Sequence, residues 1–188
     1  MNSEQKIEQD KAQESFFNKV IDRTTDFLFS SDSRKWVLLL VVIGFILRIL
    51  IINRIPLNAD EMHYAPQAIG FIDSGKLQIM DEDSLWFFLT NLAMNLFGVT
   101  FLGARFMAIL FGSLSIILIY ILGRELFNER IALIASIIMA FSPAQFIEGR
   151  AEPDIMMYFF SFLSLYFLIR FLKTGKNSLF WLTWLSIG

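Results

Sequence analysis

Apolar runs of membrane-crossing length are the feature that most limits what this 188-residue chain can fold into. A transmembrane helix needs about 20 predominantly apolar residues, within a range of about 17–25. Runs of that kind cover residues 36–52, 106–122, 131–147 and 155–172, and a shorter one covers 178–188. The sequence therefore predicts an all-α, polytopic transmembrane helix bundle with about four complete spans. The fifth run is too short to cross a bilayer, so we expect a truncated chain.

Composition supports a membrane protein and excludes several other classes. Hydrophobic residues make up 55% of the chain, which is too apolar for a soluble core of this size. The chain has no Cys, which excludes disulfides and thiolate metal sites. Its net charge of −2 gives no electrostatic reason to expect nucleic acid as a partner. We expect a membrane lipid environment instead.

The first 35 residues differ from the rest, because they mix acids, bases, Gln and Ser. A signal peptide needs a short basic start and an early apolar core, and both are missing. We therefore interpret 1–35 as a cytoplasmic tail and 36–188 as the N-terminal part of a transmembrane domain. The tail could be solvated or could lie on the membrane surface, and both alternatives stay open.

Positive charges gather in alternate loops, and this pattern predicts the orientation in the membrane. One set of loops carries Arg34, Lys35, Arg124, Arg130, Arg170, Lys173 and Lys176. The other set carries Arg54, Lys76 and Arg150, with Arg105 at a boundary. Cytoplasmic loops have an excess of Lys and Arg. We expect a cytoplasmic N-terminus and an extracytoplasmic first loop, in a plasma membrane or an ER-type membrane.

The first predicted outer loop begins with two adjacent carboxylates, Asp60 and Glu61. A short helix is predicted over 66–73, since Pro66 suits a helix start and Gly75 follows its end. The two acids would then lie in the approach to its positive N-terminal end.

A second short helix is predicted over 85–97, which is too short to cross a bilayer and suits the interface. Its polar face carries Ser84, Asn91 and Asn95. The preceding acids, Asp81-Glu82-Asp83, are better explained as a helix start than as metal ligands.

A second predicted outer loop, just before the fourth span, also carries acids, namely Glu148, Glu152 and Asp154. Acids converging from two loops, with Arg150 among them, could activate a hydroxyl, hold a divalent cation or bind a phosphate. The alternative is that outer loops are simply polar and exposed to water. The residues by themselves do not decide between these interpretations.

Two single residues have two interpretations each. His63 is the only histidine, and a metal site usually needs more nitrogen ligands, so a solvated or hydrogen-bonded side chain is the simpler explanation. Arg48 lies near the outer end of the first span. Its side chain could reach the membrane surface or face the bundle interior.

The order of these pieces resembles the GT-C membrane glycosyltransferases, typified by protein O-mannosyltransferases and the aminoarabinose transferases of lipid A. The resemblance begins at Asp60-Glu61-Met62-His63-Tyr64. It continues through 72–75, 96–99, 104–106, 119–127, 141–143 and 150–154. It covers about residues 36–188, and the ordered series is more specific than any one motif.

The resemblance implies a role for particular residues. Asp60 corresponds to the catalytic acid of the family's outer loop, and Glu61 to its partner. Tyr64, Arg105, Arg150 and Asp154 correspond to positions that bind substrate or donor, with Asp154 near the carrier phosphate. This chain has Asp83-Ser84-Leu85 where many relatives have Pro-Pro-Leu, so the substrate contacts there differ. The family's later spans are also missing.

The family's chemistry implies sugar transfer from a polyprenyl- or dolichyl-phosphate donor to a hydroxyl of a protein or lipid acceptor. Inversion at the anomeric carbon follows if there is a single displacement. The resemblance requires no cofactor, and a divalent cation could be accommodated. The metal, if any, is unknown.

Two other classes of protein stay open. A transporter fragment would have polar breaks near mid-span, whereas the acids here lie at span ends. A small non-catalytic membrane subunit would bind a partner and need no catalytic acids. The genomic reading frame past codon 188 would distinguish a fragment from a short protein.

Overall fold

A computed structural model describes residues 32–73 and 84–186. The regular elements in these ranges are α2 (Asp32–Ile51), α3 (Ala59–Asp73), α4 (Ser84–Phe97), α5 (Phe101–Leu126), α6 (Glu129–Phe141), α7 (Pro143–Ile147), α8 (Asp154–Thr174) and α9 (Asn177–Leu185). The all-α prediction is confirmed for this part of the chain. Residues 1–31 of the predicted tail and the acids Asp81-Glu82-Asp83 lie outside the described residues.

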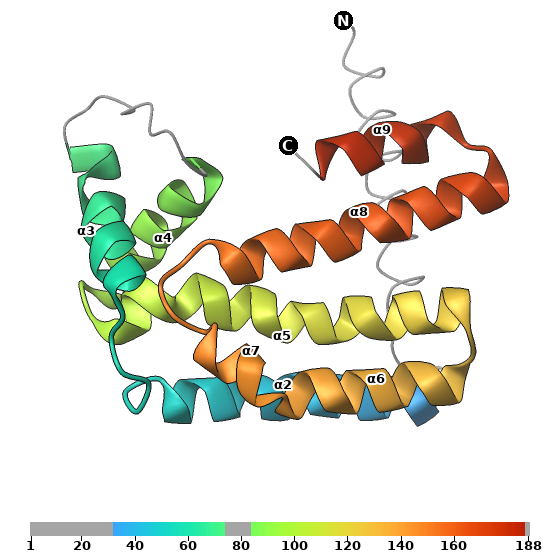
Figure 1. The fold of residues 1–188 in the computed structure, drawn as a ribbon, viewed down its shortest axis with the longest axis horizontal. Helices are drawn as coiled ribbons and strands as arrows, with labels where there is room; N and C mark the ends of the chain where they lie inside the picture. The colour runs from blue at the N-terminus through green and yellow to red at the C-terminus, as the bar shows by residue number, and fades with distance from the viewer. Residues whose placement is uncertain (1–31, 74–83, 187–188) are drawn as a thin grey trace, which may run out of the picture.

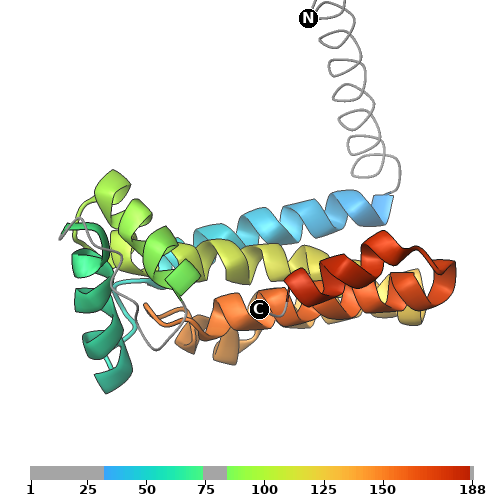
Figure 2. The ribbon, with the colours of Figure 1, turned by 90° about the horizontal axis from the view of Figure 1, so that it is seen from above.

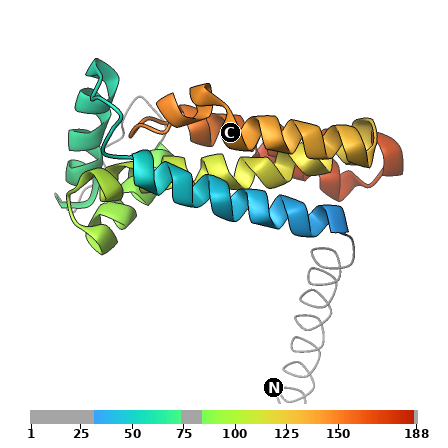
Figure 3. The same ribbon diagram turned by 90° about the horizontal axis from the view of Figure 1, so that it is seen from below.

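Helix α5 is the central element, because it contacts α2, α4, α6 and α8. The helices α2, α5, α6 and α8 run side by side (Figure 1). Helices α3 and α4 lie across one end of this bundle, as interfacial helices would (Figure 2). Helix α9 folds back along α8, and α2 lies beside α5 and α6 (Figure 3). Both acid-bearing loops therefore lie at the end covered by α3 and α4.

Side-chain caps fix where α5 and α6 begin, and a glycine allows the two helices to pack closely. The hydroxyl of Thr100 accepts a hydrogen bond from Gly103 N at 3.2 Å and so caps the start of α5. The side chain of Asn128 caps α6 in the same way, through Ile131 N. A Cβ added to Gly123 would lie 2.7 Å from the Cα of Ala132, so only glycine allows the two helices to approach this closely.

Two helices among the described residues, α5 and α8, are long and apolar enough to cross a membrane by length and composition. A core helix of a soluble protein can pass the same test, and 61% of the apolar stretch of α5 is buried. Only 17% of that of α8 is buried, so α8 presents apolar side chains outward, as lipid contact requires.

The predicted spans all coincide with helices, but the predicted number of complete spans is not confirmed. Helix α2 carries Arg34, Lys35 and Arg48, and α9 has 9 residues. Helix α6 has 13 residues, or about 20 Å, and ends before Ser142-Pro143. The chain then starts the separate helix α7 at Pro143, a residue type that suits the first turn of a helix. Four complete spans and an incomplete fifth stay a prediction.

Helix α3 starts at Ala59 and not at Pro66, so the predicted start was wrong. The side chain of Asn58 accepts a hydrogen bond from Glu61 N at 2.8 Å, which is the geometry of a helix cap. Proline inside the helix removes one backbone hydrogen bond, and α3 continues through it. The first turn therefore contains Asp60 and Glu61.

Of the polar face of α4, Asn91 packs against α3, while Ser84 and Asn95 are exposed. Asn91 is buried and donates hydrogen bonds to the carbonyls of Ala68 at 2.7 Å and Ile69 at 3.2 Å. Asn95 donates to the Asn91 side-chain oxygen at 2.8 Å. These amides fix the two short helices to each other.

Arg48 faces the bundle interior and is 3% exposed. Its Nη1 donates to the carbonyl of Gly44 at 3.0 Å, and its guanidinium lies over the ring of Phe146 at 5.1 Å. A Cβ on Gly44 would lie 2.9 Å from the same Nη1, so the missing side chain makes room for the cation. Of the two interpretations of Arg48, the structure supports the interior one.

Candidate functional site

The candidate site lies where the end of α2, the start of α3, the start of α5 and the α7–α8 loop meet (Figure 1). The strongest contact there is a buried ion pair between Glu61 and Arg105, whose side chains are 2% and 0% exposed. Two parallel hydrogen bonds join them, Nε to Oε1 and Nη2 to Oε2, each 2.6 Å long. This two-point geometry is the strongest type of carboxylate–guanidinium contact.

The remaining hydrogen bonds of this pair join it to the segment that follows α2 and to the α7–α8 loop. Arg105 Nη1 donates to the carbonyls of Ile52 and Ile55, the latter at 3.2 Å. Glu61 Oε1 also accepts a hydrogen bond from Ala151 N at 3.0 Å. The pair therefore connects α2, α3, α5 and the α7–α8 loop. Both side chains bind protein atoms in this arrangement, and their predicted roles at the substrate stay predictions.

Asp60 is the exposed member of the two adjacent acids. Successive residues on a helix point about 100° apart, so burial of Glu61 turns Asp60 toward the surface. Burial is the main cause that raises the pKa of the Glu152 carboxyl, and the nearby negative charge of Asp60 raises it further. The acids of the two loops are thus near each other.

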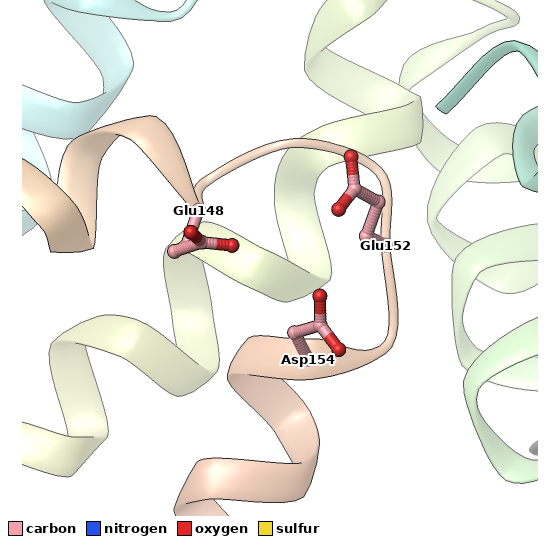
Figure 4. Close-up of side chains that lie close together, drawn as sticks. All are labelled: Glu148, Glu152 and Asp154. Carbon is pink, nitrogen blue, oxygen red and sulfur yellow. The ribbon is translucent and has the colours of Figure 1, made fainter. Parts of the chain in front are cut away.

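Three carboxylates of the α7–α8 loop form a compact group, drawn in Figure 4. One oxygen each from Glu148, Glu152 and Asp154 lie within 4.8 Å of one another. An all-carboxylate set suits a hard divalent cation such as Mg²⁺ or Ca²⁺. His63 does not belong to this group, because it is exposed and its Nε2 lies 2.9 Å from the side-chain nitrogen of Gln67.

Glu152 is the buried member of the group, at 6% exposure. Burial raises the pKa of its carboxyl, and the charges of Asp154 and Asp60 raise it further. A hydrogen bond from Asn58 and the charge of Arg150 act in the opposite direction and offset part of this rise. Ionisation of Glu152 therefore lowers the stability of the folded protein.

This loss of stability predicts a pH-dependent effect of the substitution Glu152→Gln. Because the folded-state pKa is raised, stability falls as pH increases above the ordinary pKa of glutamate, where the unfolded chain ionises first. The amide keeps an oxygen for Asn58 and carries no charge. We expect the variant to unfold a few °C higher than wild type at about pH 7, with the difference vanishing at about pH 4. Thermal unfolding in detergent measures this, and a lower unfolding temperature at neutral pH would contradict it.

The other predicted site residues have the following places. Arg150 is half-buried, and its Nε donates to the carbonyl of Pro56 at 3.3 Å. Asp154 is half-buried in the carboxylate group. The ring of Tyr64 packs edge-on against Trp86 at 5.9 Å. The structure brings Asp60, Arg150 and Asp154 to one end of the bundle, while Tyr64 belongs to the contact between α3 and α4.

An open apolar groove of about 660 Å³ runs between α3, α4 and the start of α5. Its lining comes from three separate elements: Leu57, Glu61, Met62, Ala65, Pro66, Ile69, Met94, Val99, Thr100, Phe101 and Ala104. The groove begins beside the Glu61–Arg105 pair. No local pattern in the sequence indicates this groove, because the groove depends on how α3 and α4 cross α5.

Asn58 is the residue at this site that sequence reasoning missed. It caps α3 and also donates a hydrogen bond to Glu152 Oε1 at 2.6 Å. A signal was present, since Asn followed three residues later by Glu is typical of a helix start.

Two apolar helices of membrane-spanning length and an acid-bearing end are typical of a membrane protein with a site at the end of its bundle. Residues 84–188 match the family described as dolichyl-phosphate-mannose-protein mannosyltransferase. The match covers more than half of the chain, which therefore belongs to this family and is an integral membrane protein.

A relative gives the extent of the similarity. An uncharacterised protein of Aquifex aeolicus (strain VF5) is 29% identical over 133 residues, covering 65% of this chain and 27% of the relative. The chain thus spans about a quarter of that relative's length. No solved structure matches. The family match starts at Ser84, so the loop of Asp60 and Glu61 precedes it and the roles of these acids stay predictions.

Proposed function

We propose that the whole protein is a GT-C membrane glycosyltransferase. It transfers a sugar from a polyprenyl- or dolichyl-phosphate donor to a hydroxyl of a protein or lipid acceptor. Membership in the mannosyltransferase family carries this proposal. The geometry of the bundle end supports it, because an exposed carboxylate, a half-buried guanidinium and a carboxylate group lie around one site.

In the proposed reaction, Asp60 accepts the proton of the acceptor hydroxyl while the oxygen of that hydroxyl attacks the anomeric carbon of the donor sugar. The bond from that carbon to the carrier phosphate breaks, and the phosphate leaves with the bonding electrons. A single displacement of this kind inverts the anomeric carbon. Asp60 is suited to the first step because it is exposed and lies in the first turn of a rigid helix.

The phosphate needs positive charge as it leaves. Arg150 is the better placed of the two predicted arginines, since Arg105 is fully buried against Glu61. A divalent cation held by Asp154 with Glu148 and Glu152 would supply further positive charge. Arg105 and Glu61 then act by fixing the start of α3, which carries Asp60.

The apolar groove supports a lipid-linked donor. It borders the same turn of α3 and is lined almost entirely by apolar side chains. A chain of isoprene units could occupy such a surface, whereas a water-soluble nucleotide sugar would leave it exposed.

The orientation of the site is testable, because the chain has no cysteine of its own. We expect a cysteine at Met62, which is 65% exposed, to react with an impermeant maleimide added to intact cells. A cysteine at Lys176, also exposed, should react only after the cells are opened. The reverse pattern would place the site in the cytoplasm and contradict transfer from an outward-facing donor.

Transfer itself tests the proposal. Membranes containing the full product of the gene should move a labelled sugar from a polyprenyl-phosphate donor to an acceptor hydroxyl. Absence of transfer to both protein and lipid acceptors from such donors would contradict the proposed function and favour a non-catalytic membrane subunit.

A further inference from the structure

We propose that Asn58 is a positioning residue, whose side-chain amide fixes the start of α3 against the α7–α8 loop. This role rests on the glycosyltransferase function proposed above. Asn58 Oδ1 accepts from Glu61 N at 2.8 Å, and Asn58 Nδ2 donates to Glu152 Oε1 at 2.6 Å. Because each end of the amide has a matching partner, both partners fix the same orientation of the amide.

These two contacts belong to a closed ring. Glu61 Oε1 accepts from Ala151 N at 3.0 Å, and the next residue along the chain is Glu152. The path therefore runs from Asn58 to Glu61, across to Ala151, on to Glu152 and back to Asn58. Two segments that are distant in the sequence are joined at two points, which resists rotation of one against the other.

The ring encloses the part of the chain that carries the proposed base. Asp60 lies between Asn58 and Glu61, and Asp154 lies two residues after Glu152. Asp60 and Glu152 are both carboxylates, so their negative charges repel each other. The Nδ2 hydrogen bond of Asn58 is an attractive contact across this gap. Together with the Glu61–Ala151 contact and the hydrogen bond from Arg150 to Pro56, it holds the two acid-bearing segments at a fixed separation.

A helix cap by itself does not require asparagine. Asp, Ser and Thr cap helices about as well, since only an oxygen acceptor is needed. The donor to Glu152 is what an asparagine adds at this position. The structure provides a comparison in Asn128, which caps α6 through Ile131 N at 3.0 Å, far from the carboxylate group.

The experiment is a double-mutant cycle on transfer by the full gene product in membranes. Asn58→Asp keeps the cap and places a carboxylate against Glu152. We expect turnover to fall by about 10–100-fold, as for a small displacement of a reacting group, with a smaller change in the KM for the donor. In a Glu152→Gln background, the amide at position 152 can donate to the new carboxylate. There, Asn58→Asp should lower turnover by less than about 3-fold.

The control is Asn128→Asp, which makes the same change at a cap without a partner across the gap. Its turnover should stay within about 2-fold of wild type. An equal loss from Asn58→Asp in both backgrounds, or no loss in either, would overturn the role of Asn58. Failure of the proposed function looks different, because wild type would then show no transfer or Asp60→Asn would retain it.

Discussion

Replacement of Asp60 by asparagine is expected to lower the turnover of the full gene product by about 10²–10⁴-fold. The amide keeps the size of the side chain and removes the proton acceptor that the proposed reaction needs. Asp60 is exposed, so the change leaves no buried group without its partner. Thermal stability and the KM for the donor should change little. The measurement is sugar transfer from a polyprenyl-phosphate donor in detergent.

Asp154→Asn is the comparison for this prediction. Asp154 belongs to the carboxylate group, so its loss should act mainly on the affinity for donor or cation and less on turnover. Near-normal turnover in Asp60→Asn would remove the proposed base. Asp60 would then be a solvated residue in the first turn of α3 of a membrane protein whose chemistry lies elsewhere.

Replacement of Arg105 by methionine is expected to destabilise the fold by about 3–5 kcal/mol, because it leaves the Glu61 carboxylate buried without its cation. The carbonyls of Ile52 and Ile55 lose their donor as well. For a chain of this size, the loss corresponds to a fall of about 10 °C in the unfolding temperature. Thermal unfolding of the purified protein in detergent measures it.

Two further variants distinguish the pair from a general loss of charge. The double variant Arg105→Met with Glu61→Leu should regain much of the stability, since no unpaired charge is then buried. Arg170→Ala removes an ion pair with Glu125 that is 3.1 Å long and 41% exposed on the arginine side. That change should cost less than about 1 kcal/mol. If Arg105→Met and Arg170→Ala lowered the free energy of unfolding equally, the buried pair would contribute no more to stability than an exposed one.

The helices were predictable because their signals are local. Apolar runs located α2, α5, α6, α8 and α9. The start of α3 was misplaced because Pro66 was taken as the helix start, whereas Asn58 and Glu61 carried the stronger capping signal. The sequence contains both possible helix starts, and the chain uses the one at Asn58.

The candidate site was less predictable because its contacts are long-range. Asp60 and Glu61 are adjacent and similar in chemistry, yet one is exposed and the other is buried. That difference follows from Arg105, which is 44 residues further along the chain. Capping, periodicity and charge bias predict where an acid lies along an element. They do not predict which distant cation it pairs with.

The buried contacts of Glu61 also set an order of assembly during synthesis. The ribosome makes Glu61 first, Arg105 44 residues later and Ala151 90 residues later. Until α5 has entered the membrane, the carboxylate has no cation and must stay in water, because burying it alone is too costly. The start of α3 can therefore take its final position only when α5 is in place, and the site takes its final form after the loop before α8 has emerged. A nascent chain stopped before Ala151 would already carry every atom of Asp60 and still lack the arrangement that positions it.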